Sequence, residues 1–232
     1  MEVITIPFGG AYDVKIPTLI GVDNGEKIKQ AHLGIISPPI DTAFVVTDAN
    51  VMRQCRGDAF VSSLRKAVSR VVTMTIGGGE SNKSLDTLVE IARTALREGA
   101  TKRSVVVCFG GGVVLNIGGL LAGLLYRGIR LVHVPTTLLA QHDVITSLKT
   151  AVNVCGRKNN FGMMHPSILN IVDVSYLRTL SDAEWESGMG ELAKNAVLLG
   201  GEYMDILRDG VTQNADDSTL TSLVKCGIAA KA

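Results

Sequence analysis

The stretch SVVVCFGGGVVLNIGGLLAGLLYRGIRLVHVPTT, residues 104–137, decides the fold class of this 232-residue chain. Its first apolar run, 105–109, has the length of a buried strand and ends in three glycines. Residues 113–126 then predict a helix with small residues for close packing, and a second apolar run over 129–135 predicts another strand. A strand, a helix and a strand in this order predict a parallel β-α-β unit.

The same alternation continues on both sides of this unit. The pattern predicts a β-hairpin over 2–16 around Gly9-Gly10, strands over 42–48, 71–79 and 169–173, and a helix over 81–100. The apolar residues of that helix recur at 85, 88, 89, 92, 95 and 96, which is the spacing of one buried helix face. We therefore expect an α/β fold with a parallel sheet that carries helices on both faces.

The pattern changes at about Leu177, because only helices are predicted downstream, over 181–207 and 218–232. We expect an α/β domain over 1–176 and the start of an α-helical domain over 177–232. The last helical pattern has neither a cap nor a turn. The chain is therefore expected to be a truncated piece of a longer protein, and to be inactive alone.

Composition limits the possible partners. The net charge of +1 gives no electrostatic footprint for nucleic acid or for an anionic membrane surface. The sequence shows no run of 18 apolar residues and no signal peptide. The four cysteines form no C-x-x-C pair, and Cys108 in its apolar run is expected to be buried. A cytoplasmic location is the default expectation.

Candidate binding groups follow the predicted strands. In an open parallel sheet, ligands bind outside the carboxyl ends of the strands, where Asp48, residues 78–80, residues 110–112 and Thr136-Thr137 fall. Glycines let a pyrophosphate approach the backbone at a helix start, and a carboxylate suits a ribose diol. Each corner alone is more simply a sharp turn, but four together favour a nucleotide. The G-x-G-x-x-G fingerprint is broken by Leu115, and no G-K-[ST] follows.

Two further groups of residues are open to two interpretations. Residues 141–166 have the composition of a loop and carry Asp143, Lys149, Asn153, Arg157, Lys158, Asn159 and Asn160. This loop suits a phosphorylated, polyhydroxylated substrate, or is a solvated surface. Glu191 and Lys194 share a helix face, as a surface ion pair or as a metal-binding carboxylate beside a substrate-binding lysine. The four histidines, at 32, 133, 142 and 165, lack ligand spacing and are expected to be structural.

Taken in order, the motifs resemble the sugar phosphate cyclases, the superfamily of 3-dehydroquinate synthase. The matching segments are TDAN, GGGESNKS, FGGGVVLNIGG, YRGIRLVHVPTTLLAQHD, SLKTAVN, RKNNFG, LRTLS and GMGELAKNA, from about residue 45 to the end. The resemblance implies an NAD-binding α/β domain, a helical domain that binds zinc or cobalt, and a homodimer. It also implies a lyase that oxidises a sugar phosphate transiently, eliminates phosphate, reduces the ketone and closes a carbocycle.

The resemblance also assigns roles to individual residues. The implied NAD-binding residues are Asp48, Glu80, Lys83, Gly111, Gly112, Asn116, Thr136, Thr137, Asp143, Lys158 and Thr179. The implied substrate-binding residues are Asp143, Lys149, Lys158, Asn159 and Lys194, with Arg127 reaching the phosphate in the partner subunit. The expected catalytic residues are Asp143, Lys149, Glu191 and Lys194, and Glu191 is the expected metal ligand. Two further metal ligands, both histidines, are expected beyond residue 232.

Two departures from the dehydroquinate synthase pattern point to one branch of the family. Asn116 stands where those enzymes have Asp in GGGVxxD, and SLKTAVN replaces GGKTGVN. Both resemble the 2-deoxy-scyllo-inosose synthases, which act on glucose 6-phosphate in aminoglycoside antibiotic biosynthesis. Thr150 keeps the dehydroquinate synthase residue, so that enzyme or a heptulose 7-phosphate cyclase remains the alternative. The GGGSxxD and TTxGTGSE patterns of an iron-type alcohol dehydrogenase are absent from this sequence. A scaffold that has lost catalysis is disfavoured by the retained Lys149, Asn159, Glu191 and Lys194.

Overall fold

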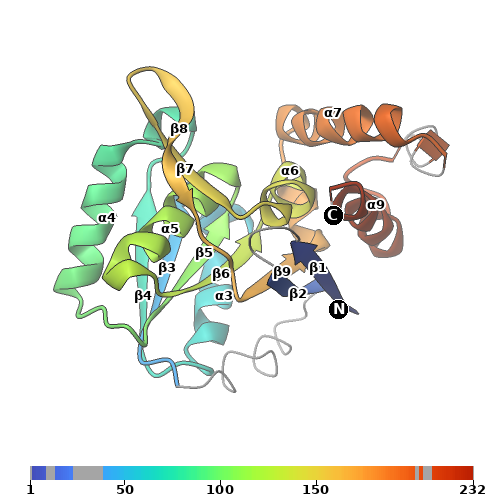
Figure 1. Ribbon diagram of the computed structural model, residues 1–232. Coiled ribbons are helices and arrows are strands. Elements are labelled where there is room, and N and C mark those ends of the chain that lie inside the picture. The colour runs from blue at the N-terminus through green and yellow to red at the C-terminus, as the bar shows by residue number, and fades with distance from the viewer. Residues whose placement is uncertain (1, 9–13, 23–38, 202–203, 206–210, 232) are drawn as a thin grey trace.

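A seven-stranded sheet forms the centre of the computed structural model, which describes residues 2–8, 14–22, 39–201, 204–205 and 211–231. The strand order is β1-β2-β9-β6-β5-β3-β4 (Figure 1). The strands are β1 (Glu2–Phe8), β2 (Val14–Gly21), β3 (Ala43–Asp48), β4 (Val71–Ile76), β5 (Val105–Gly110), β6 (Arg130–Pro135) and β9 (Leu169–Asp173). The pair β1 and β2 is antiparallel, and every other neighbouring pair is parallel. The predicted α/β class is confirmed.

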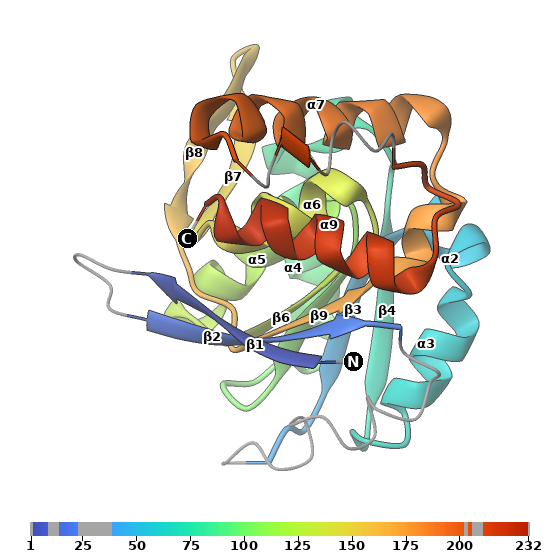
Figure 2. The same ribbon diagram turned by 90° about the vertical axis from the view of Figure 1, so that its right-hand side faces the viewer.

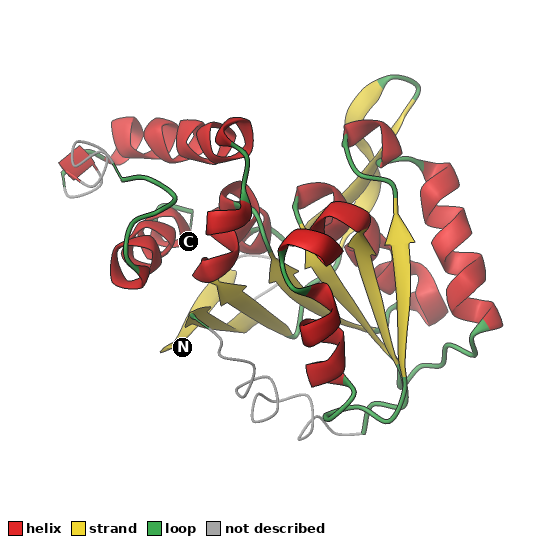
Figure 3. Ribbon diagram, turned by 180° about the vertical axis from the view of Figure 1, so that it is seen from behind, coloured by secondary structure: helices red, strands yellow, loops and turns green. Residues whose placement is uncertain are grey.

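Helices cover both faces of the sheet, as Figure 3 shows from behind. Val106 and Cys108 of β5 join the core beneath α4 (Leu85–Arg97) and α5 (Gly112–Leu124). Their neighbours Val107 and Phe109 join a second core with α2 (Ala49–Gln54) and α3 (Gly57–Leu64). Because both faces are buried, β5 is apolar at nearly every position, as a central parallel strand should be.

A group of helices packs beside the β2 and β9 side of the sheet. It contains α6 (Leu138–His142), α7 (Asp182–Leu199) and α9 (Asp217–Ala229), which Figure 2 shows above β1 and β2. Two glycines permit the close packing of these helices. A Cβ on Gly188 would lie 2.7 Å from Cβ of Leu138, and a Cβ on Gly227 would lie 2.6 Å from Cβ of His142.

The predicted strands and the helices α4 and α5 are present at their expected places. One interpretation was wrong: residues 141–166, predicted as a loop, contain the antiparallel hairpin β7 (Lys149–Val154) and β8 (Arg157–Met164). Every residue of β8 is exposed, so its sequence carries no apolar alternation that could have indicated a strand. The sequence made no prediction for α2 and α3.

The remaining expectations concern Cys108, residues outside the described ranges, the domain boundary and membrane-spanning helices. Cys108 is fully buried as expected, and burial raises the pKa of its thiol. The Gly9-Gly10 turn, His32 and residues 202–203 and 206–210 of the predicted helical region lie outside the described residues. The domain boundary near residue 176 stays a prediction. Within the described ranges, no helix has the length and hydropathy needed to cross a bilayer.

Candidate functional site

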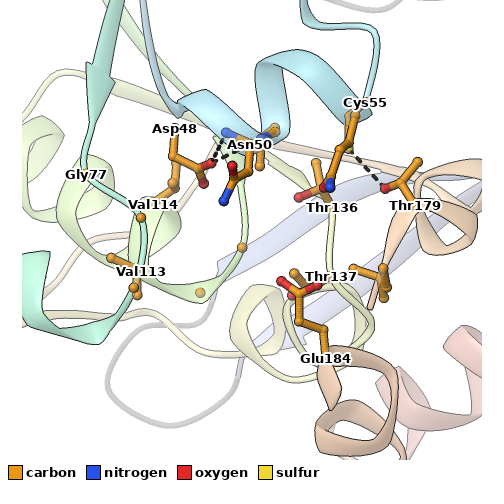
Figure 4. Close-up of a pocket in the computed structure, with 17 residues that line it drawn as sticks. Asp48, Asn50, Cys55, Gly77, Val113, Val114, Thr136, Thr137, Thr179 and Glu184 are labelled. Carbon is orange, nitrogen blue, oxygen red and sulfur yellow. Dashed lines mark hydrogen bonds between the residues drawn. The ribbon is translucent and has the colours of Figure 1, made fainter. Parts of the chain in front are cut away.

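A cavity of about 240 Å³ lies at the carboxyl ends of the central parallel strands (Figure 4). It is bounded by the residues that follow β3, β4, β5 and β6 and by the chain that leads into α7. Six of the predicted cofactor-binding residues line it: Asp48, Gly111, Gly112, Thr136, Thr137 and Thr179. The parallel topology therefore gathers groups that lie far apart in sequence, as the rule for ligands at strand ends predicts.

The N-terminus of α5 faces this cavity, since its N-cap Gly111 and first residue Gly112 line the wall. Space around these glycines is limited. A Cβ on Gly110 would lie 2.6 Å from Cγ2 of Val114, and a Cβ on Gly111 would lie 3.0 Å from Cγ2 of Thr137. Glycine caps the helix without a side chain, so backbone N–H groups and the positive end of the helix dipole can meet an anion. The cradle fits the pyrophosphate of a dinucleotide.

The polar side chains of this cavity are held in place by local hydrogen bonds. Oδ1 of Asp48 accepts from the backbone N–H groups of Asn50 at 2.8 Å and Val51 at 3.0 Å, which caps α2. Oγ1 of Thr137 accepts from the N–H of Ala140 at 3.2 Å and caps α6. Oγ1 of Thr179 donates to the carbonyl oxygen of Tyr176 at 2.7 Å. These fixed groups are suited to hydroxyls and phosphates of a nucleotide.

A second cavity of about 1000 Å³ lies between α5, the end of α6 and the hairpin β7–β8. Gly112 and Val113 line both cavities, so the first turn of α5 is a wall that they share. The predicted site residues on this second cavity are Glu80, Lys83, Asn116, Asp143, Lys149, Lys158 and Asn159. Three of these are lysines, which gives the cavity the cations that a phosphate requires.

Lys83 is the buried cation of the second cavity, with 6% of its surface exposed. Its Nζ donates to Oδ1 of Asn159. Burial lowers the pKa of Lys83, and the nearby Lys158 lowers it further, whereas Glu80 acts in the opposite direction. An ammonium held in place by the Asn159 amide can also donate to an oxygen of a bound ligand.

Asn116 joins α5 to the hairpin. Its Nδ2 donates to the carbonyl oxygen of Gly112 at 2.8 Å, and its Oδ1 accepts from the N–H of Ala151 at 3.2 Å. A carboxylate could accept the second bond, but it could not donate the first. The residue that departs from the dehydroquinate synthase pattern thus fixes β7 against the first turn of α5.

Asp143, Glu191 and Lys194 lie close together, and Lys231 lies among them. Nζ of Lys231 lies 2.8 Å from Oδ1 of Asp143 and 2.7 Å from Oε1 of Glu191, and Lys194 donates to the same Glu191 oxygen. Burial alone would raise the pKa of Glu191, but the hydrogen bonds from both lysines outweigh it and hold that pKa below its ordinary value. Lys231 could not be identified from the sequence, because it follows the end of α9, 40 residues from Glu191, with no spacing signal.

The fit of a metal ion rests on Glu191. Within the described ranges, no group of three or more His, Cys, Asp or Glu side chains is placed to hold a metal. Glu191 is ionised and partly exposed, so it fits as one carboxylate ligand of zinc or cobalt. His142 and His165 instead contact backbone carbonyls of Gly188 at 3.3 Å and Ile129 at 2.9 Å.

Arg127 lies apart from both cavities. It belongs to η2 (Leu125–Arg127) after α5, is exposed, and has a φ of 66°. It is not among the residues that line the two cavities. Its predicted role in the site of a partner subunit stays a prediction.

Comparisons with known proteins agree with this arrangement. Residues 73–187 match the family described as 3-dehydroquinate synthase N-terminal. A 2-deoxy-scyllo-inosose synthase from Streptomyces fradiae is 37% identical over 222 residues, which are 95% of this chain and 51% of that protein. A 3-dehydroquinate synthase from Shouchella clausii is 35% identical over 173 residues, which are 75% of this chain and 47% of that protein. This chain thus spans about half the length of these curated relatives.

A solved structure extends the likeness to three dimensions. A crystal structure of 2-deoxy-scyllo-inosose synthase complexed with carbaglucose-6-phosphate, NAD+ and Co2+ matches with a TM-score of 0.88 at 27% identity. The match covers 99% of this chain and 61% of that one.

Proposed function

This chain belongs to the 3-dehydroquinate synthase-like sugar phosphate cyclases, and on that premise we propose that it carries the cofactor site of a 2-deoxy-scyllo-inosose synthase. The proposed enzyme converts glucose 6-phosphate to the carbocycle 2-deoxy-scyllo-inosose and releases phosphate. The observation that supports this most directly is the pair of cavities that meet at Gly112 and Val113. A dinucleotide in the smaller cavity would present its reactive ring to a sugar phosphate in the larger one.

The residues of the two cavities have distinct parts in this proposal. NAD, when bound, would accept and return a hydride, and a zinc or cobalt ion on Glu191 would polarise the reacting oxygen. The glycine N-terminus of α5 binds the pyrophosphate, and Asp48 binds the ribose diol. Lys149 and Lys158 line the larger cavity and hold the phosphate that leaves. Asp143 and Lys194 orient the sugar hydroxyls beside the metal.

The choice of glucose 6-phosphate rests on Asn116, on the SLKTAVN segment and on the relatives named 2-deoxy-scyllo-inosose synthase. A substrate without a carboxylate needs fewer cations than a heptulosonate phosphate does. The alternative is 3-dehydroquinate synthase or a heptulose 7-phosphate cyclase, and the relative from Shouchella clausii keeps it open. We also propose that the protein acts as a homodimer, in which the partner subunit's Arg127 reaches the substrate phosphate.

Phosphate release by the full-length protein tests the proposal. The protein would receive NAD and cobalt or zinc, with glucose 6-phosphate or the heptulosonate phosphate as substrate, while NADH absorbance is followed. Release from glucose 6-phosphate without accumulation of NADH is the expected result. Release from the heptulosonate phosphate alone would make the protein a dehydroquinate synthase, and steady NADH production would indicate a dehydrogenase. NAD binding without turnover of either sugar would indicate a scaffold.

A further inference from the structure

Asn153 lies at an irregular point of the hairpin, outside the two cavities. The ladder between β7 and β8 shifts register between Val152 and Val154, so the ladder pairs Asn153 with no residue of β8. It instead forms an isolated parallel bridge with Ser84, the N-cap of α4. Its backbone N–H donates to the carbonyl oxygen of Lys83 at 2.8 Å. The irregularity thus turns this residue toward the segment that follows β4.

The side chain of Asn153 contacts both sides of the larger cavity. Its Nδ2 donates to Oε1 of Glu80 at 2.8 Å, and its Oδ1 accepts from the N–H of Asn159 at 2.8 Å. Glu80 belongs to η1 (Glu80–Asn82) and Asn159 belongs to β8. The Asn153 amide therefore donates to Glu80, a proposed cofactor-binding residue, and accepts from Asn159, a proposed substrate-binding residue.

The conformation of Asn159 depends on this bond. Its φ is 54°, in the left-handed region that asparagine adopts more readily than most residues. Its backbone N–H is held by Asn153, while its Oδ1 accepts from the buried Lys83. Lys83 and Asn159 thus meet across the gap between η1 and the hairpin, and Asn153 bonds to both segments.

We propose that Asn153 is a positioning residue that sets Glu80 and Asn159 in register, so that cofactor and sugar phosphate sites form together. This inference rests on the proposed function. It assigns Asn153 no contact with either ligand, since it lines neither of the cavities described. Its effect passes through the two hydrogen bonds of its side chain.

The test replaces the donor of the Asn153–Glu80 hydrogen bond with an acceptor in the full-length protein. In Asn153→Asp, the carboxylate can still accept from Asn159 but stands against the carboxylate of Glu80. We expect NAD affinity to fall about tenfold and the KM for glucose 6-phosphate to rise in parallel, as loss of a hydrogen bond to a charged group predicts. In N153D/E80Q, a glutamine amide can donate to the new carboxylate. The KM of this double variant should return to that of E80Q alone.

Asn160 provides the matched control on the same hairpin. Its Oδ1 accepts from the N–H of Val154 at 2.9 Å and its Nδ2 donates to the same residue's carbonyl at 3.1 Å, so these bonds stay within the hairpin. The effects of N160A and E80Q should add, whereas those of N153D and E80Q should not. Thermal unfolding of each variant without ligand separates loss of fold from loss of binding.

Three outcomes separate this inference from the proposed function. If N153D leaves NAD affinity and KM within twofold of wild type, or E80Q gives no rescue, Asn153 is only a structural residue. If the wild type releases phosphate from none of the sugar phosphates, the proposed function fails, but the same variants still test the coupling through NAD affinity. If the wild type binds no NAD at all, both proposals are wrong.

Discussion

Asn116 makes two hydrogen bonds that an aspartate in its place could not both keep. Its Nδ2 donates to the Gly112 carbonyl, which a carboxylate cannot do. We therefore expect Asn116→Asp to lower the free energy of unfolding by about 1–3 kcal/mol at pH 7. The difference should shrink as the new carboxyl group is protonated near pH 4, because it then regains a donor. Denaturant unfolding at both pH values measures this, and the exposed Asn214→Asp is the control. Equal stability of N116D and wild type at pH 7 would contradict the role assigned to this bond.

The residues of the site differ in how far the sequence could identify them. Asp48 and Thr137 follow apolar strands directly, so strand prediction alone places them at the sheet edge. Glu191 and Lys194 share one helix turn and were found by spacing. Lys231 lies 40 residues from Glu191, and nothing in the intervening sequence indicates that the two meet. Contacts between distant helices depend on tertiary packing, which local patterns do not encode.

Helix α5 is the element whose packing depends most on glycine. A Cβ on Gly118 would collide with Sγ of the buried Cys108 on β5, and a Cβ on Gly119 would lie 2.5 Å from Cγ2 of Thr150 on β7. Gly118→Ala should cost about 1–2 kcal/mol, since overpacking outweighs the gain in helix propensity. The double variant G118A/C108A should recover most of this loss, because the sulfur no longer occupies the space.

Thermal unfolding of both variants checks this expectation. Gly190→Ala in α7 is the control, since a Cβ there would meet no described atom within 4 Å and the helix should gain stability. A G118A protein as stable as the wild type would show that β5 and α5 can separate at no cost.

The central strands were predictable from their apolar runs, and the exposed strand β8 was not. The strands β3, β5 and β6 are buried along most of their length and form apolar runs in the sequence. The hairpin strand β8 is exposed throughout, so it has a polar composition that resembles a loop. The position of the hairpin comes from the hydrogen bond of Asn153 on β7 to Glu80 on η1 and from the tight turn at Cys155 and Gly156, where φ is 53° and 71°. Such tertiary anchors leave no periodic signal.

Buried basic groups among the described residues, of which His133 is one, should make the stability of the whole molecule depend on pH. His133 lies in the centre of the sheet, and burial lowers its pKa from 6.5 to about 3. Its Nδ1 has no hydrogen-bond partner among the residues described. Below pH 6.5 the imidazole of His133 is protonated in the unfolded chain, whereas in the folded chain it stays neutral until about pH 3. This contribution to stability is therefore intact above pH 6.5 and is lost progressively as the pH falls between those values.

At pH 5.5 the loss from His133 should be about 1.4 kcal/mol relative to pH 7.5. Thermal unfolding across this range measures it, and His133→Leu should reduce the slope because it removes the titrating group. A slope unchanged by H133L would assign the pH dependence to other residues.

The hairpin also affects how the substrate-facing surface of such proteins can be exchanged in evolution. The chain enters β7 and leaves β8 at one neck, where the N–H of His165 donates to the carbonyl of Leu148 at 2.9 Å. The segment between these two residues supplies part of the wall of the larger cavity, including Lys149, Lys158 and Asn159, while the glycine wall belongs to the sheet and α5. One exchange at this neck would therefore replace these three residues together. A recombination event or a chimera joined at this neck could replace the substrate-facing surface and leave the cofactor cradle inherited intact.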